Sequence, residues 1–412
     1  MTLQYDPSPR RLSPTGHRSA AVFLLLLAAV LVLPGVVQAQ ETTAAIRGLV
    51  VDPSGLPVPG AQVEVLDQRT GVLRNFTTNN EGAFLATRLT PGGPYTVIVN
   101  ETRTVVVESI SVSNIYNLTI DTGPVQLSET VEVVADTRTL VDVAPGPAAT
   151  YTTFEVETAP AFNRDIVEVY GIDPRINIDN EERGFQVNCA GKHPRFNSVT
   201  LDGVSYNDRF GLNANGYNTA VGMPFPFDSL SQVAVEMSPF DVTYGGFSAC
   251  NINSVTKSGS NQIAGNVFYE YTGDNLRRNI GEVTPDFNDR NWGATFGGPI
   301  LRDKLFFFGA YENSSQFVPL AMGYAGSGNG VERPWLSQAD YDRIESIASN
   351  VYNYNTGGLP SDGTREADKV LLKLNWNISQ RHNLAAIFNY FDGFEDRASD
   401  NDSNEFEFAN HF

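Results

Sequence analysis

The spacing of hydrophobic positions changes twice along the chain. An uninterrupted apolar run covers residues 20–33. Residues 44–121 then carry short runs of β-branched and aromatic residues, each ended by a turn sequence. After residue 262 apolar and polar residues alternate over stretches of about ten positions, a two-residue period typical of strands with two different faces. A mainly β protein is therefore predicted behind an apolar leader.

The leader has the features of an export signal. Three arginines precede the apolar run of residues 20–33, and residues 37–39 (Val-Gln-Ala) offer the small side chains that a signal peptidase accepts. A signal peptide over residues 1–39, cleaved between Ala39 and Gln40, is expected. The alternative is a membrane-spanning helix, for which this run is shorter than the roughly 20 residues that a bilayer core requires.

The segment of residues 40–122 is predicted to form a small β-sandwich. Its strand-like runs are separated by turn sequences rich in Pro, Gly and Asn, as in small sandwiches. The predicted strands are Ala45–Val51, Ala61–Leu66, Val72–Thr78, Gly82–Thr87 and Tyr95–Val99.

A set of glycines, prolines and apolar residues in this segment follows a recognisable pattern. The pattern consists of Gly48-x-Val50-x-Asp52, Gly55-x-Pro57, Gly60-Ala61-x-Val63, Gly82-x-Phe84, Leu89-x-Pro91-Gly92 and Tyr95-x-Val97. It resembles the carboxypeptidase regulatory-like domain, a prealbumin-like sandwich. The resemblance implies a folding or docking unit that is not itself catalytic.

Residues 123–147 are expected to form a linker that contains one strand-like run. That run is Glu129, Thr130, Val131, Glu132, Val133, Val134 and Ala135. A short extended segment can add to the sheet edge of a partner protein. The run resembles the TonB box, through which energised receptors are engaged from the periplasm; the alternative is a last strand of the preceding sandwich.

Residues 148–260 mix strands with loops rich in Gly and Asn. Residues 197–204 read as a strand that ends in an Asp-Gly turn, and residues 230–236 alternate as a strand does. Further matching pieces are Phe162-Asn-Arg-Asp165, Leu201-Asp-Gly-Val204, Asn207-Asp208, Ser238–Val242, Gly245-Gly-Phe247 and Ile252–Gly259. Together they resemble the plug domain of TonB-dependent receptors, particularly the Oar-like branch, and imply an α+β plug.

The chain contains two cysteines, Cys189 and Cys250, both within residues 148–260. An exported protein meets an oxidising periplasm in which such a pair can form a disulfide, and this pairing is predicted. The alternative is a metal site that also uses His193, but the paired spacing typical of zinc ligands is missing. Neither a metal nor a cofactor is expected.

Residues 261–412 are predicted to contain the first strands of an antiparallel outer-membrane β-barrel. The clearest alternation places Val370, Leu372, Leu374, Trp376 and Ile378 on one face and Leu371, Lys373, Asn375 and Asn377 on the other. Strands are predicted near residues 262–273, 290–299, 304–313, 368–378 and 382–391. Long and short connections alternate between them, as external loops and periplasmic turns do in barrels. About five strands fit, whereas a lumen that holds a plug needs about 22, so the chain is expected to be a fragment or a truncated product.

The longest predicted loop contains a helical pattern over Pro334–Tyr352. Ser337 and Asp340 have the spacing of a helix start, and apolar residues then recur on one face. That face is formed by Ile344, Ile347, Ala348 and Val351. It is expected to pack against the loop itself.

Charge and motif content exclude several function classes. The formal net charge is −19, and removal of residues 1–40, with three Arg and one Asp, moves it to −21. Such acidity disfavours nucleic acid as a partner. No catalytic motif with a useful spacing occurs, so an enzyme is not expected. Asp202 is assigned a structural role in its Asp-Gly turn, and the acidic residues of 392–407 are assigned to a solvated loop.

The resemblances together imply a receptor in the outer membrane of a Gram-negative cell. Its plug and N-terminal domain would face the periplasm. The implied partners are TonB with ExbB and ExbD, outer-membrane lipid and an unidentified extracellular substrate. A surface adhesion or assembly protein without active transport is the first alternative, and a secreted soluble enzyme is the second.

Overall fold

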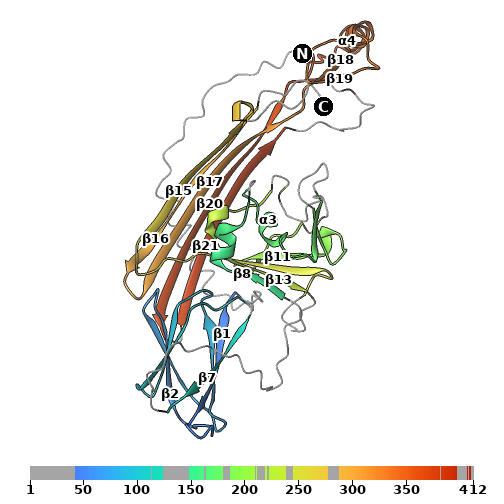
Figure 1. Cartoon of the computed structure of the whole chain (residues 1–412). Helices are drawn as coiled ribbons and strands as arrows, with labels where there is room; N and C mark the ends of the chain where they lie inside the picture. Colours follow the sequence, from blue (N-terminus) through green and yellow to red (C-terminus); the bar gives the residue numbers. More distant parts are fainter. Residues whose placement is uncertain are drawn as a thin grey trace. The chain divides into compact units, whose positions relative to one another are not determined.

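The structure, a computed structural model, describes most of the chain after residue 41. The described residues are 42–112, 114–123, 148–161, 164–179, 186–208, 210, 219, 222–237, 245–276, 287–380, 382–396, 406, 408 and 409. The predicted signal peptide with its cleavage site between Ala39 and Gln40 lies outside them, as does the segment Glu129–Ala135. Strands dominate the described residues, as the sequence predicted (Figure 1).

The first described segment is a sandwich of two sheets. One sheet has the order β4-β1-β7, with strands Ala83–Leu89, Ala44–Val51 and Ile115–Asp121; the other has the order β3-β2-β5-β6, with strands Val72–Thr77, Gln62–Asp67, Tyr95–Val99 and Arg103–Val107. Alternate residues of each sheet point into a common apolar core. Strands β6 and β7 were not among the predicted strands. The turn before β6 uses Asn100 and Glu101, both at positive φ, and carries no Gly or Pro to mark it.

Residues 148–256, here named the central unit, contain a mixed five-stranded sheet. Its order is β12-β11-β14-β13-β8, with strands Val204–Ser205, Ser198–Leu201, Cys250–Thr256, Leu230–Met237 and Ala148–Tyr151. The remaining elements are α2 (Thr153–Thr158), α3 (Ile166–Tyr170), the hairpin of β9 (Ile176–Asp179) and β10 (Gln186–Cys189), and the short turns of helix η1 (Pro194–Phe196) and η2 (Phe227–Ser229). Every residue of β14 is buried, so this strand forms the middle of the unit.

A disulfide joins Cys189 to Cys250, and the two Cα atoms are 6.0 Å apart. Cys189 ends β10 and Cys250 begins β14, and both side chains are fully buried. The bond therefore fastens the β9–β10 hairpin to the central strand of the sheet. His193, the third residue of the alternative metal site, instead begins η1, where its Nδ1 accepts a hydrogen bond from the Arg195 amide.

Five long strands form an antiparallel sheet in chain order. They are β15 (Ala264–Gly273), β16 (Asn288–Leu301), β17 (Leu305–Val318), β20 (Gly363–Ser379) and β21 (His382–Glu395). Short turns follow β16 and β20, and long connections follow β15 and β17. Most strands exceed the predicted length of about ten residues. The additional residues adjoin the long connections and are largely polar, as Ser314–Gln316 and Thr364–Glu366 illustrate, so hydrophobic alternation did not reveal them.

The chain enters this long-strand sheet directly from the central unit, through residues 257–263. Gly259 lies against the backbone of β16 and β17: a Cβ atom there would come within 2.3 Å of the Phe307 carbonyl oxygen. Only glycine permits this close passage of two backbones. The connection therefore holds the start of β15 close to the middle strands.

The connection between β17 and β20 contains β18 (Met322–Tyr324), β19 (Val331–Arg333) and the helix α4 (Gln338–Tyr352). The helix begins four residues later than predicted because Ser337 is its N-cap and accepts a hydrogen bond from the Asp340 amide. The expected packing of its apolar face is wrong: Ile344, Ile347 and Val351 are exposed, and the helix instead buries Tyr341 against other aromatic rings. No helix among the described residues is long and apolar enough to cross a bilayer.

Candidate functional site: polar contacts between the central unit and the long strands

The two faces of the long-strand sheet meet different surroundings. On one face, here named the outer face, large apolar side chains are exposed; in β20 they are Leu372, Leu374, Trp376 and Ile378. The opposite, inner face is buried in the middle strands β17 and β20, where Phe308, Ala310 and Leu371 belong to the same apolar cluster as the core of the central unit. A soluble protein rarely exposes so continuous an apolar surface, whereas a barrel wall presents one to lipid.

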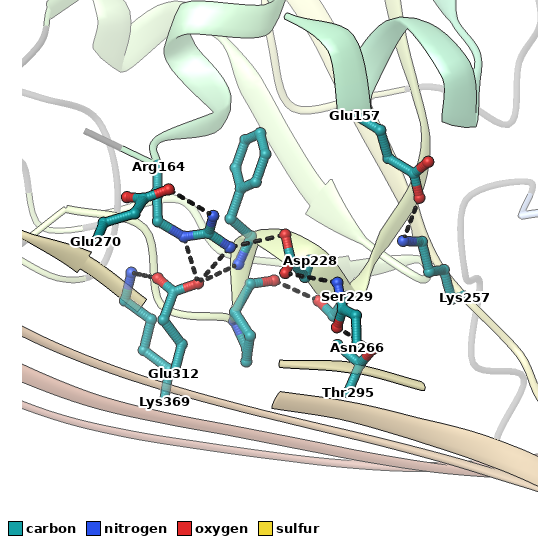
Figure 2. A network of polar contacts seen from close by, with 12 residues as sticks. Glu157, Arg164, Asp228, Ser229, Lys257, Asn266, Glu270, Thr295, Glu312 and Lys369 are labelled. Atoms are coloured by element: carbon teal, nitrogen blue, oxygen red, sulfur yellow. Dashed lines mark hydrogen bonds and ion pairs between the residues drawn. The ribbon is translucent and has the colours of Figure 1, made fainter. Parts of the chain in front are cut away.

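Charged residues interrupt the apolar inner face where the central unit covers it. The most connected is Arg164, which precedes α3 and has a positive φ of 51°. Its guanidinium lies 2.7 Å from Asp228 in η2, 3.3 Å from Glu270 in β15 and 3.4 Å from Glu312 in β17. Figure 2 shows the guanidinium surrounded by these three carboxylates. One arginine of the central unit thus joins two strands of the long-strand sheet.

Glu312 is the centre of the network on the side of the long strands. Its carboxylate accepts hydrogen bonds from the Arg164 guanidinium, from Lys369 Nζ at 2.9 Å and from the Phe227 amide at 3.0 Å (Figure 2). The side chain of Glu312 is only 2% exposed, and that of Lys369 only 8%. A carboxylate buried this deeply requires such partners, because removal from water otherwise costs several kcal/mol.

Aromatic rings and amides complete the surroundings of Arg164. The guanidinium carbon lies 3.5 Å from the ring centroid of Phe268 in β15 and 5.4 Å from that of Phe227. Both rings present negative π faces to the cation. Asn266 donates to Asp228 at 3.1 Å and accepts from Thr295 at 2.6 Å, so the second oxygen of Asp228 is also held by the strands (Figure 2).

The electrostatic balance keeps the arginine charged. Burial lowers the pKa of Arg164, but the carboxylates of Glu312, Asp228 and Glu270 outweigh burial and raise it above its ordinary value. The neighbouring Asp165 caps α3 by accepting from the Val167 amide. Burial raises the pKa of the Asp165 carboxyl, although that amide and the charge of Lys369 act against the rise.

A second polar contact joins the units at β20. Lys373 Nζ donates to Asp202 at 3.2 Å and to the carbonyl and hydroxyl oxygens of Thr256 at 3.1 and 3.0 Å. Asp202 has a positive φ of 47° in the turn after β11, and its carboxylate also accepts from the Thr256 amide. The sequence identified the turn at Asp202 but not its lysine partner.

The network was not among the predicted site residues. Arg164 lies in the quoted Phe162–Asp165 piece, and the positions of Glu312, Lys369 and Lys373 in their strands assign them to the inner face. Charged residues on the buried face of a strand need a partner, and this was the available signal. Of the predicted site residues, the structure brings Cys189 and Cys250 together, while Glu129–Ala135 and Ala39 with Gln40 lie outside the described part of the chain.

Comparison with known families agrees with this architecture. Residues 45–152 match the carboxypeptidase regulatory-like domain, which covers the sandwich and extends to β8. Residues 255–322 match the outer membrane beta barrel domain, which covers β15, β16 and β17. The chain therefore combines a regulatory-like sandwich with barrel strands of the outer-membrane type, and its location is the outer membrane of a Gram-negative cell.

A curated relative is similar to part of the chain. The chain is similar to the TonB-dependent transporter Oar of Myxococcus xanthus, with 33% identity over 146 residues, which are 33% of this chain and 13% of that protein. The match thus spans a small part of the relative's length. That relative is a TonB-dependent transporter by name.

Solved structures of receptors and transporters also resemble the chain. The siderophore receptor PirA from Acinetobacter baumannii aligns with a TM-score of 0.43 and 14% identity over 61% of this chain and 32% of the receptor. The outer membrane transporter YddB from Escherichia coli aligns with a TM-score of 0.44 and 16% identity over 63% of this chain and 35% of the transporter.

Proposed function

We propose that the chain acts in a TonB-dependent outer-membrane receptor that takes up an extracellular substrate and is not an enzyme. In this proposal the central unit is the plug, and the long strands belong to the barrel wall. The sandwich and the plug face the periplasm, where TonB, driven by ExbB and ExbD, engages residues 129–135.

The observation that carries the proposal is the buried ionic contact between the central unit and the inner face. Apolar packing alone would hold the plug in place but would not provide a contact that entering water can open. In a buried ion pair, the attraction between the charges and the cost of removing them from water are of similar size. Such a pair fixes the position of the plug while contributing little net stability, and water entering the lumen can solvate both partners. Arg164 and Glu312 therefore suit a contact that must hold and later open.

The connection from residues 129–135 to the plug passes through β8. This four-residue strand forms the edge of the central sheet and pairs antiparallel with β13, from Val233–Tyr151 to Glu236–Ala148. A pull along an edge strand loads its few hydrogen bonds together. The proposed sequence is thus displacement of β8, strain on the adjacent helices α2 and α3, and then separation of Arg164 from Glu312.

The proposal is tested with the periplasmic domain of TonB as the probe. Outer membranes that contain the full chain are expected to retain this domain, and deletion of residues 129–135 is expected to abolish retention. Deletion of residues 136–142, an equal length of the same linker, is the matched control and should retain it. Equal retention by both deletions would refute the role of residues 129–135.

Uptake separates the receptor from the surface adhesion alternative. A receptor with residues 129–135 deleted should still bind its substrate at the cell surface but lose energised uptake. An adhesion or assembly protein would keep its phenotype in cells that lack TonB. Any phenotype that persists unchanged without TonB would therefore favour the alternative.

A further inference from the structure

A second interface lies between the sandwich and the central unit, and the proposed function does not use it. Gln232 in β13 is fully buried, with 0% exposure, although it is a polar residue. Its side chain reaches the sandwich segment of residues 109–112, which follows β6. Its amide oxygen accepts from the Val112 amide at 2.9 Å, and its amide nitrogen donates to the Ile110 carbonyl at 3.2 Å.

Both hydrogen-bonding groups of the Gln232 side chain are thus satisfied by the backbone of another unit. A side-chain amide offers one acceptor and one donor group, and a segment of extended backbone presents the complementary pair. Apolar contact surrounds this polar clasp: Val112, Ala234 and Val255 form a separate buried cluster, and each is at most 4% exposed. Burial of a glutamine without such partners would be unfavourable. Gln232 is therefore suited to a position that the docked sandwich covers.

The sandwich also touches the end of the long-strand sheet where the short turns lie. The Asn261 amide donates to the Arg69 carbonyl at 2.9 Å, and the Asn261 side chain exchanges two hydrogen bonds with Asp303. Gly71 lies so close to Asp303 that a Cβ atom would come within 2.2 Å of its carboxylate oxygen. Asp303 lies in the turn between β16 and β17. This second contact is independent of Gln232 and involves a different edge of the sandwich.

We propose that the regulatory-like sandwich docks on the central unit through the Gln232 clasp, which comprises Gln232, Ile110 and Val112, and on the β16–β17 turn through Asn261. Residues 124–147 connect β7 of the sandwich to β8 of the central unit. With the sandwich docked, the elements on both sides of this connection are anchored on the central unit. Covalent connection makes the association intramolecular, so a small interface is sufficient for docking.

The consequence for a pulled receptor rests on the proposed function, whereas the docking itself does not. A pull on residues 129–135 would act on two anchors: β8 on one side and the docked sandwich on the other. The sandwich would share the load until the clasp opens. It would thus set how far TonB must pull before β8 is displaced.

The test uses cysteines in the full chain, purified in outer membranes, with a specific protease site inserted into residues 136–142. Val112→Cys with Ala234→Cys places two thiols within one buried cluster. Val106→Cys with Ala234→Cys is the matched control, because Val106 lies on β6 but is exposed. After oxidation and cleavage of the linker, a non-reducing gel shows whether the sandwich stays covalently attached.

Docking predicts at least tenfold faster attachment for the Val112 pair than for the control pair. Gln232→Met keeps the side-chain length but removes both hydrogen bonds, and it is expected to slow attachment about tenfold. Equal rates for the two pairs would overturn the proposal. Hydrogen–deuterium exchange provides a second test that needs no cysteine variants. The Val112 amide should exchange slowly in the native chain and faster in Gln232→Met. Fast exchange in the native chain would also overturn the proposal. Neither readout involves TonB, so failure here is distinguishable from failure of the proposed function.

Discussion

Removal of the Glu312 charge should lower the free energy of unfolding of the central unit. Removal of the Lys369 charge as well should restore part of that loss. Glu312→Gln deprives Lys369 of the one salt-bridge partner that the described residues give it. Loss of one member of a buried pair costs about 3–5 kcal/mol, because the remaining charge stays buried without compensation. Lys369→Met is expected to cost less, roughly 1.5–3 kcal/mol, since Glu312 keeps Arg164 and the Phe227 amide.

The double variant Glu312→Gln with Lys369→Met should be more stable than Glu312→Gln alone. Without both charges, Arg164 keeps Asp228 and Glu270, and no ammonium is left unpaired. The expected rescue is about 1–2 kcal/mol. Added to the roughly 1.5–3 kcal/mol cost of Lys369→Met, it gives an interaction energy of about 2.5–5 kcal/mol, which lies at or above the upper end of the range for directly interacting residues. The double-variant cycle therefore measures the interaction itself and not the effect of either substitution on folding.

The assay is brief proteolysis of outer membranes equilibrated in urea, which digests the central unit only where it has opened. With a urea dependence of about 1–3 kcal/mol per molar, a loss of 3 kcal/mol lowers the midpoint by roughly 1–3 M. The midpoint of the double variant should lie above that of Glu312→Gln. Strictly additive losses, or a double variant less stable than Glu312→Gln, would refute the network as described.

Three further predictions concern other parts of the chain. Burial raises the pKa of Asp165, so its contribution to stability is fully present below the ordinary carboxyl pKa and is lost as pH rises through the raised value. Asp165→Asn, which keeps a good N-cap, should therefore gain stability relative to the native chain between pH 4 and pH 7 in urea titrations, and an unchanged difference would contradict this. Cys189 and Cys250 should not react with a maleimide in exported, unreduced protein, and free thiols would disprove the bond. Because 61 residues separate the two cysteines, replacing both by Ser should lower the free energy of unfolding by about 4 kcal/mol. Leu374→Arg on the outer face should cost about 2–4 kcal/mol in membrane-insertion measurements, and Asn375→Arg on the inner face should cost less; equal costs would argue against lipid contact.

The strands were predictable where burial follows a simple period. In β20 one face is apolar and exposed and the other is buried, so two-residue alternation identified the strand and both of its faces. The same reasoning missed β6, because the preceding turn contains Asn100 and Glu101 in place of glycine. Local sequence signals thus located the strands but failed at a turn with unusual residues.

The contacts that make the site were not predictable from spacing. Arg164 and Glu312 are 148 positions apart, and Asp202 and Lys373 are 171 apart. Nothing in the local sequence of Arg164 identifies which strand will carry its partner. In helix α4 a local pattern was present but predicted the wrong contact. Its apolar face suggested packing, but Ile344 and Ile347 are exposed, because Tyr341 makes the contact with the rest of the connection.

The accessibility of a buried residue of the central unit in living cells shows whether TonB releases that unit from the long strands. Ser229, at the end of η2, is 0% exposed, and cysteine is close to it in size. Ser229→Cys should react with a membrane-impermeant maleimide in cells that grow in substrate-containing medium with active TonB, ExbB and ExbD. It should stay unlabelled in the same cells without TonB. Equal labelling in both strains would contradict a plug that is held by Arg164 and Glu312 and released by TonB.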